Sequence, residues 1–267
     1  MSTLDIISAF KARHSVRTFQ PDFPKDKAEL VDSIIKETNL ITPPFGSKVN
    51  LQKHEPGLGR FGSISGEAGW IMLVIPKDLQ GEERRKAYID AGDLGQLAVM
   101  KLTQNSIGSV WIGGTYDEAK AEESTPDHQV IAGIPFGIEC GKHMIAKMLS
   151  FFSGSSSRYP VEKLFYNKDK NEPFTEENAG EWKEIIMCLR SGPSALNYQT
   201  WRFVIENNNV HLYHAPSREA STFDLGIAIA NMELLLHDKG YEIKVLENQP
   251  ETSPLGGTYQ ISAVKKD

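Results

Sequence analysis

The feature that most constrains the fold of this chain is an internal repeat. Similar residues occur in the same order in the two halves of its 267 residues. The matched pairs are Ile34-Ile35 with Ile185-Ile186, Pro43 with Pro193, Trp70 with Trp201, Asp93 with Asp224, and Gly108 with Gly240. The spacing between partners shortens along the chain because the first half carries an extra stretch near the Gly-rich segment 53–69. This pattern predicts that one structural unit is duplicated within the chain.

Hydrophobic periodicity predicts similar elements in both halves. Each half reads as a helix, a loop with proline, a strand, a helix rich in small residues, and two strands, with one additional strand in the second half. The ranges are 25–39, 70–75, 86–106, 109–114 and 130–139 in the first half, and 174–190, 201–205, 210–215, 223–240, 241–246 and 258–264 in the second. A short helix is expected over 4–13 and a loop over 53–69.

These elements predict an α+β fold in which mixed and antiparallel sheets are flanked by helices. We expect residues 1–150 to form the first repeat and residues 161–267 the second. The Ser-rich stretch 151–160 is expected to be a linker or extended arm between them. Together the two repeats should form one compact unit, a pseudo-dimer within a single chain.

Composition excludes several classes of function. The chain has 29 Lys and Arg against 35 Asp and Glu, a net charge of −6, which disfavours general nucleic-acid binding. Its two cysteines, Cys140 and Cys188, form no metal-binding or disulfide pattern and suit a reducing cytoplasm. Neither a secretory signal nor an apolar run long enough to span a bilayer is evident, so no membrane association is expected.

Two further motifs resemble binding sites but do not predict one. The segment 57–62 reads G-x-G-x-x-G, but a dinucleotide-binding fingerprint needs a strand before it and a helix after it, and neither is predicted here. His211 and His214 lie three apart in a predicted strand, where their side chains would face opposite sides. We therefore predict no metal site, and no catalytic acid, base or nucleophile stands out in the sequence.

Three other motifs suggest binding. Arg13, Ser15 and Arg17 alternate after the first helix, and in an extended segment they would converge on one place, as a phosphate group requires. Segment 192–201 presents Ser, Asn and Gln after a helix-breaking Gly-Pro pair. Segment 110–114 is a strand ending in Gly-Gly, where another group can approach the backbone closely. Taken singly, each also fits a bland interpretation: a solvated basic turn, a helix stop, and a strand-end turn.

Taken together, these motifs resemble the FMN-dependent nitroreductase family. RHSVRTF at 13–19 is similar to its opening R-x-S-x-R/K-x-F, and PSALNYQTW at 193–201 to its P-S-x-x-N-x-Q-P-W. Segment 107–114 resembles its G-x-x-x-W-x-G-G strand end, 133–137 its G-Y-P strand, and 157–160 its S-R-x-P segment. Here the P-S-x-x-N-x-Q motif follows the S-R-x-P segment instead of preceding it. This order resembles a branch of the family in which two repeats in one chain replace the homodimer.

The resemblance implies a set of FMN-binding residues. Arg13, Ser15 and Arg158 would bind the phosphate, Arg17 the phosphate or the N1–C2=O edge of the flavin, and His14 would offer backbone or ring contacts. Gly113 and Gly114 would approach N5 and O4 with backbone N–H groups. The ribityl chain and pyrimidine rim would be lined by Pro193, Ser194, Asn197 and Gln199. The second half has no R-x-S-x-R motif of its own, so one FMN per chain is expected.

The resemblance further implies an oxidoreductase that passes hydride from NADH or NADPH through the flavin to a small conjugated acceptor, such as a nitroaromatic or a quinone. The alternatives are another flavin chemistry of the same fold, such as dehydrogenation or dehalogenation, and a flavin-binding or flavin-sensing protein without turnover. The 45–69 segment is a candidate lid in the second of these three cases. The chain is expected to act as a monomeric pseudo-dimer in the cytoplasm.

Overall fold

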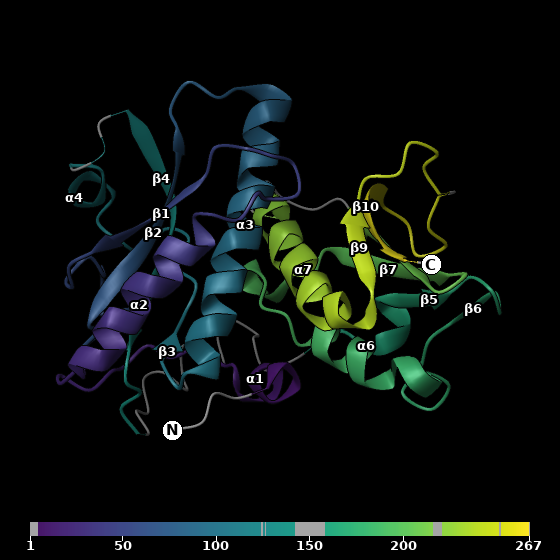
Figure 1. Ribbon diagram of the computed structural model, residues 1–267, viewed down its shortest axis with the longest axis horizontal. Coiled ribbons are helices and arrows are strands. Elements are labelled where there is room, and N and C mark those ends of the chain that lie inside the picture. The colour runs from purple at the N-terminus through teal and green to yellow at the C-terminus, as the bar shows by residue number, and fades with distance from the viewer. Residues whose placement is uncertain are drawn as a thin grey trace. The chain divides into compact units, whose positions relative to one another are not determined.

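The computed structural model describes residues 5–123, 125, 127–141, 158–215, 221–250 and 252–266 (Figure 1). By its contacts the chain divides into two units, Met1–Phe152 and Ser153–Asp267. Most of the expected linker 151–160 lies outside the described residues, which resume at Arg158. Within the described part, no helix combines the length and apolar character needed to cross a membrane.

Unit 1 is built on a four-stranded antiparallel sheet in the order β1-β2-β4-β3. Its elements are α1 (Ile6–Ala12), α2 (Lys25–Thr38), β1 (Asn50–His54), β2 (Gly69–Pro76), α3 (Gly81–Gln104), β3 (Gly108–Ser109), α4 (Glu118–Glu122) and β4 (His128–Gly137). Helices α2 and α3 lie side by side (Figure 1). The long helix α3 is buried along most of its second half, as its small and aliphatic residues require.

The core of unit 1 explains why its central strand reads as a continuous apolar run. Residues 70–75 of β2 are all fully buried, because β2 has a neighbouring strand on both edges and is covered on both faces. Trp70 packs in one buried cluster with Val16, Leu58 and Ile64. The N-terminal segment and the loop before β2 are therefore integral parts of this unit.

Unit 2 is built on a six-stranded sheet in the order β6-β5-β7-β8-β10-β9, in which β5 and β7 are parallel and the other neighbours antiparallel. Its strands are β5 (Phe165–Asn167), β6 (Glu172–Pro173), β7 (Trp201–Glu206), β8 (Asn209–His214), β9 (Tyr241–Lys244) and β10 (Thr258–Lys265). Its α-helices are α6 (Lys183–Arg190) and α7 (Ser221–Leu236). Short 3-10 helices are η1 (Val161–Lys163), η2 (Gly180–Trp182), η3 (Ala195–Asn197) and η4 (His237–Lys239).

The two units repeat one topology, which supports the predicted duplication. In unit 1 the order after α2 is β1, β2, α3, β3, the short helix α4 and β4, and in unit 2 the order of strands and α-helices after α6 is β7, β8, α7, β9 and β10, with no counterpart of α4 among the described residues. The sheet orders β1-β2-β4-β3 and β7-β8-β10-β9 then correspond strand by strand. The match of connectivity and pairing is stronger than the sequence similarity that suggested it, because sheet order does not follow from element order alone.

One matched pair of the sequence comparison is wrong. Trp70 lies in β2, the second strand of its repeat, whereas Trp201 begins β7, the first strand of the other. The extra stretch of the first half therefore lies between its first two strands, where unit 2 has only the tight turn of Asn207 and Asn208. The polar sequence NLQKH of β1 has no apolar pattern that predicts a strand, and without β1 the two tryptophans align.

The remaining differences concern element bounds. The strand expected over 109–114 is only β3, followed by an isolated bridge from Ile112 to Gly133. The helix expected over 174–190 begins only at the 3-10 turn Gly180–Trp182 and continues as α6. Helix α3 begins at Gly81, before its expected start, and α4, β5 and β6 were not predicted. The expected helices over 4–13, 25–39 and 223–240 and the strands over 70–75 and 130–139 are confirmed within a few residues.

Candidate functional site

The segment after α1 carries the predicted residues Arg13, Ser15 and Arg17. Helix α1 ends at Ala12, and Arg13 at its C-cap has extended backbone, with φ −61° and ψ 120°. Ser15 then pairs with Ser109 in a parallel bridge, and later bridges tie the segment to the loop before β2 and to the residues after β4. These bridges fix the backbone that presents the three side chains.

The guanidinium group of Arg17 is half-buried, and desolvation lowers its pKa. Among the described residues we find no hydrogen bond or ion pair that this group makes. By contrast, Arg60 of the same unit pairs with Asp117 at 3.0 Å. Because a partly buried cation without a counter-charge is costly, the environment of Arg17 suits an anionic ligand, and the fork of a guanidinium matches a phosphate group.

The imidazole of His14 is engaged within unit 1. Its Nδ1 lies 2.9 Å from the carbonyl oxygen of Ala12, and its Nε2 lies 3.0 Å from Oε1 of Glu139. Desolvation lowers the pKa of His14, but the bonds to Glu139 and Ala12 outweigh it, so that the net pKa is raised. With both ring nitrogens occupied, His14 ties the N-terminal segment to the residue after the end of β4, and a ligand contact would involve its backbone.

Gly113 and Gly114 lie exposed after the bridge of Ile112 with Gly133. A Cβ atom built on either glycine would meet no atom within 4 Å. The packing of unit 1 therefore does not require glycine at these positions, in contrast to Gly95, where a Cβ would lie 2.3 Å from the Trp111 ring. The open space leaves room for another group to approach the backbone closely.

The Gly-rich segment before β2 is anchored at several points. Leu58 and Ile64 are buried in the core, and the backbone N–H of Arg60 donates to the carbonyl oxygen of Thr115 at 2.9 Å. Phe61 between these anchors is 91% exposed and has a left-handed backbone with φ 57°. The 45–69 segment thus contains a strand and two buried anchors, and Phe61 is a large apolar side chain that it leaves exposed.

In unit 2, the loop between α6 and β7 carries Pro193, Ser194, Asn197 and Gln199. Its conformation is unusual, because Leu196, Asn197 and Gln199 all have left-handed backbones, with φ of 48°, 60° and 46°. Non-glycine residues adopt this region at a cost of about 1 kcal/mol or more each. The hydroxyl oxygen of Ser194 accepts the N–H of Gln199 at 3.1 Å, which closes the loop on itself.

Arg158 is partly buried and joins this loop. Its guanidinium donates to the side-chain oxygen of Asn197 and, at 3.1 Å, to the carbonyl oxygen of Ser191. Burial, together with the charge of Arg190, lowers the pKa of Arg158. Its hydrogen-bond partners among the described residues are an amide oxygen and a backbone carbonyl, and neither carries a charge that would compensate its own. The structure thus brings together two residues, Arg158 and Asn197, that are 39 positions apart in the sequence.

Gln199 is fully buried within the same loop. Its side-chain oxygen accepts the N–H of Tyr159 at 3.1 Å, and its side-chain nitrogen donates to the carbonyl oxygen of Asn197 at 3.2 Å. Arg202 donates to the carbonyl oxygen of Gln199 at 2.9 Å. The amide of Gln199 therefore holds the loop in place. Arg202 also supports the loop, and no sequence motif had indicated it.

Asp224, in the first turn of α7, is a second residue whose role the sequence did not assign. Its carboxylate accepts the backbone N–H of Ala195 at 2.9 and 3.1 Å from its two oxygens. The side chain is almost fully buried, and desolvation raises its pKa to about 7 despite the hydrogen bond from Ala195. The one sequence feature that could have drawn attention to Asp224 is the Asp-Leu-Gly tripeptide, which occurs in both repeats.

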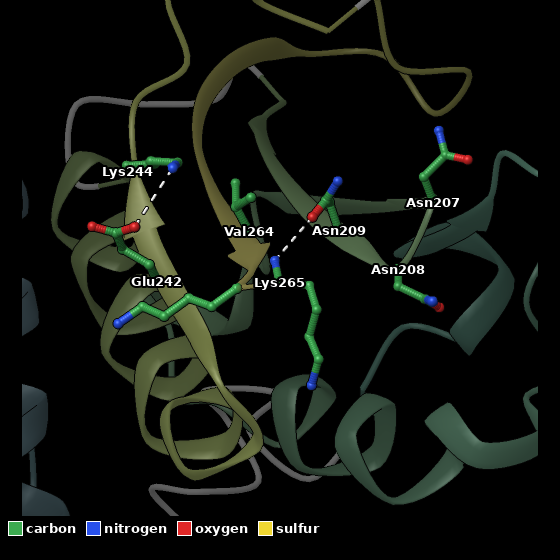
Figure 2. A pocket seen from close by; sticks show the side chains of 8 residues that line it. Asn207, Asn208, Asn209, Glu242, Lys244, Val264 and Lys265 are labelled. Atoms are coloured by element: carbon green, nitrogen blue, oxygen red, sulfur yellow. Dashed lines mark hydrogen bonds and ion pairs between the residues drawn. The ribbon is translucent and has the colours of Figure 1, made fainter.

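A separate hollow lies on unit 2 and is polar (Figure 2). It is formed by the 207–209 turn and by residues of β9 and β10, where Lys244 lies 3.5 Å from Glu242. None of the predicted binding residues lines it. Over the described ranges, no group of three or more His, Cys, Asp or Glu side chains is placed to hold a metal ion.

Comparisons with known proteins address the family and the fold. A family model described as "Putative TM nitroreductase" matches residues 5–235. A "putative nitroreductase" from Thermotoga maritima superposes with a TM-score of 0.64 at 18% identity, covering 98% of this chain and 94% of that one. No curated protein gives a significant match.

Shorter chains match about half of this one. A "putative nitroreductase" from Desulfovibrio desulfuricans, solved in complex with FMN, has a TM-score of 0.38 at 16% identity, covering 55% of this chain and 96% of that one. An NAD(P)H:FMN oxidoreductase from Staphylococcus epidermidis, so described provisionally, has a TM-score of 0.43 at 11% identity over the same shares. The Thermotoga chain shares the fold of this one along nearly its whole length, and the match of the family model over residues 5–235 shows that this chain belongs to the nitroreductase family.

Proposed function

We propose that the protein is an FMN-dependent oxidoreductase that uses NADH or NADPH to reduce a small conjugated acceptor, such as a nitroaromatic or a quinone. Membership of the nitroreductase family supports this proposal. The observation that carries it is the guanidinium of Arg17, half-buried and without a partner among the described residues, on a segment with the family's opening motif.

The residues present fit FMN in their chemistry. A phosphate group needs cationic and hydroxyl donors, and Arg13, Ser15 and Arg17 of unit 1 and Arg158 of unit 2 would supply them. An otherwise acidic protein, with a net charge of −6, needs such local cations to hold a phosphate. The charges of Arg17 and Arg158, for which the described residues provide no ion pair, are therefore the expected state of a protein whose anion is a ligand.

The remaining predicted residues would hold the rest of the cofactor. Pro193, Ser194, Asn197 and Gln199 would line the ribityl chain and the pyrimidine rim. Gly113 and Gly114 would present backbone N–H groups where a side chain would obstruct the approach, and the open space at both positions supports this role. One FMN per chain is proposed, because R-x-S-x-R occurs in the first repeat alone.

When bound, FMN would supply the ring that accepts hydride from the nicotinamide and returns electrons to the acceptor. The chain's own contribution is binding and orientation. Backbone N–H groups at Gly113 and Gly114 would fix the position of the ring edge, and a guanidinium near the pyrimidine would favour its negative charge. We propose no side-chain acid or base.

Cys140 and Cys188 are not joined in a disulfide, which suits a reducing cytoplasm, the location we propose. The chain would act as a monomer whose two repeats replace the subunits of a dimer. NAD(P)H and the acceptor are its proposed partners.

The test is to record the visible absorption spectrum of the purified protein, then denature it and count the released flavin. About one FMN per chain is expected, followed by bleaching of the 450 nm band on anaerobic addition of NADH or NADPH. A colourless protein that takes up no added FMN would overturn the proposal. If the protein binds FMN but neither NADH nor NADPH reduces it, the proposed cofactor stands and the proposed reaction is refuted.

A further inference from the structure

We propose that Asp224 is the positioning residue that holds the 193–199 loop of unit 2 in the conformation that binds the flavin. This inference rests on the proposed function, which assigns the loop to FMN. Its own basis is the pair of contacts from the carboxylate of Asp224 to the N–H of Ala195, at 2.9 and 3.1 Å.

The loop needs such support because its backbone is strained. Three of its non-glycine residues, Leu196, Asn197 and Gln199, have left-handed φ angles. Leu196 also leaves an apolar side chain 66% exposed. Conformations of this kind persist only where the surroundings impose them, and they concentrate at ligand-binding sites. The hydrogen bond from Ala195, next to Leu196, is placed to impose it.

Asp224 is suited to this task because its carboxylate is buried and rigid. The residue is 2% exposed and lies in the first turn of α7, whose following residues form the core of unit 2. The N–H of Ala195 is the only hydrogen-bond donor that the described residues offer to this carboxylate. A buried carboxylate with a single backbone donor adds little to folding stability. The buried carboxylate of Asp224 is better explained by the conformation that it imposes on the loop.

The first repeat contains the same device. In α3 the buried carboxylate of Asp90 accepts the N–H of Phe45 at 3.0 Å and that of Ser47 at 2.8 Å. The loop that it holds is the one that corresponds in sequence to 193–199. By its contacts with the loop, Asp90 is the counterpart of Asp224. Sequence similarity pairs Asp224 with Asp93 instead, which lies one helical turn after Asp90.

The duplication therefore provides a matched control. Both aspartates are buried in equivalent helices, Asp90 near the middle of α3 and Asp224 in the first turn of α7. Both accept hydrogen bonds from backbone N–H groups of equivalent loops. The loop held by Asp90 has lost the Asn and Gln of the motif, since it reads TPPFGSKVNLQ. Replacing either aspartate by alanine should disturb folding to a similar extent, whereas only Asp224 should affect FMN.

The experiment compares the wild type with Asp224→Ala, Asp224→Asn and Asp90→Ala. Each protein is titrated with FMN by flavin fluorescence, its melting temperature is recorded without FMN, and the visible circular dichroism of bound FMN is measured. We expect Asp224→Ala to weaken FMN binding by about tenfold or more and to change the dichroism of the bound flavin. Asp224→Asn, which keeps one oxygen acceptor, should recover part of the affinity, and Asp90→Ala should bind FMN within about twofold of wild type.

Equal FMN affinity and dichroism in folded Asp224→Ala and wild type would overturn the inference while leaving the proposed function intact. Equal losses of FMN affinity in Asp224→Ala and Asp90→Ala would also overturn it, because they would indicate a general effect on folding. Failure of the wild type itself to bind FMN would instead refute the proposed function. If Asp224→Ala does not fold, Asp224→Asn decides. This variant loses one of the two oxygens that face the N–H of Ala195, so wild-type FMN affinity and dichroism in it would overturn the inference.

Discussion

His14 and Glu139 join the N-terminal segment of unit 1 to the residues after β4, with Nε2 and Oε1 3.0 Å apart. Both side chains are half-exposed, so the pair is open to solvent screening. The pKa of His14 is nevertheless raised, because the bonds to Glu139 and Ala12 outweigh the desolvation that lowers it. The pair thus helps to place the segment that carries Arg13, Ser15 and Arg17.

This relationship gives a prediction about pH. Because the folded-state pKa of His14 lies above the ordinary value of 6.5, its contribution to stability is fully present below pH 6.5 and is lost as the pH rises through the higher folded value. In a Glu139→Gln variant the pKa of His14 should fall and this pH dependence should shrink. Melting temperatures of both proteins, measured at low salt on either side of neutrality, test it. A difference between the two proteins that is larger at high pH would contradict the assignment.

Arg17 should show opposite effects on binding and on folding. In Arg17→Gln the half-buried cation without a partner among the described residues is removed, so the stability of the protein without FMN should stay the same or increase. The affinity for FMN should fall by about tenfold or more, because a charged donor to the phosphate is lost. Urea unfolding and FMN titration measure the two effects. Arg85, a partly exposed residue that pairs with Glu82 at 2.9 Å, provides a control, and Arg85→Gln should leave FMN affinity unchanged. A stability loss in Arg17→Gln without a change in FMN affinity would refute the phosphate role.

Two glycines of unit 1 should respond in different ways to the same substitution. Gly113→Ala should leave the melting temperature nearly unchanged, because its Cβ meets no atom within 4 Å, but it should weaken FMN binding if the flavin approaches this backbone. Gly95→Ala should destabilise the protein by about 1–3 kcal/mol, because its Cβ would lie 2.3 Å from the Trp111 ring and 2.8 Å from Leu73. Thermal unfolding of both variants and FMN titration of Gly113→Ala decide. Wild-type FMN affinity in Gly113→Ala would remove Gly113 from the proposed site.

Asp224 should make folding stability depend on pH in the direction opposite to that of an ordinary carboxylate. Burial raises its pKa from 3.8 to about 7, so it binds a proton on folding between these values. Its stabilising contribution is therefore full below 3.8 and is lost as the pH rises through about 7. In Asp224→Asn this dependence is absent. Free energies of unfolding in urea, taken from about pH 5 to about pH 8, should fall more steeply with pH in the wild type than in the variant. Parallel curves would show that the carboxyl is ionised throughout.

Much of the fold could be predicted from the sequence because its signals are local. The continuous apolar run of β2 and the small residues of α3 are patterns of burial that neighbouring residues display directly. Strand β1 was missed because it lies at the edge of its sheet and carries polar residues that face solvent. That omission in turn placed Trp70 and Trp201 on equivalent strands, which the sheet order contradicts.

The sequence by itself determined the duplication, the motifs at 13–17 and 193–199, and the family to which they point, because these depend on residue type and spacing along the chain. Only the tertiary structure decided which groups support those motifs. Arg158 reaches Asn197 across 39 positions, and Asp224 reaches Ala195 across 29. Such contacts have no local signal, because a charged side chain has the same letter whether it is solvated or buried. Folding decides which group each charged side chain contacts and how deeply it is buried. For Asp224, burial and the contact with Ala195 set the pKa, and the same contact holds the loop in its conformation.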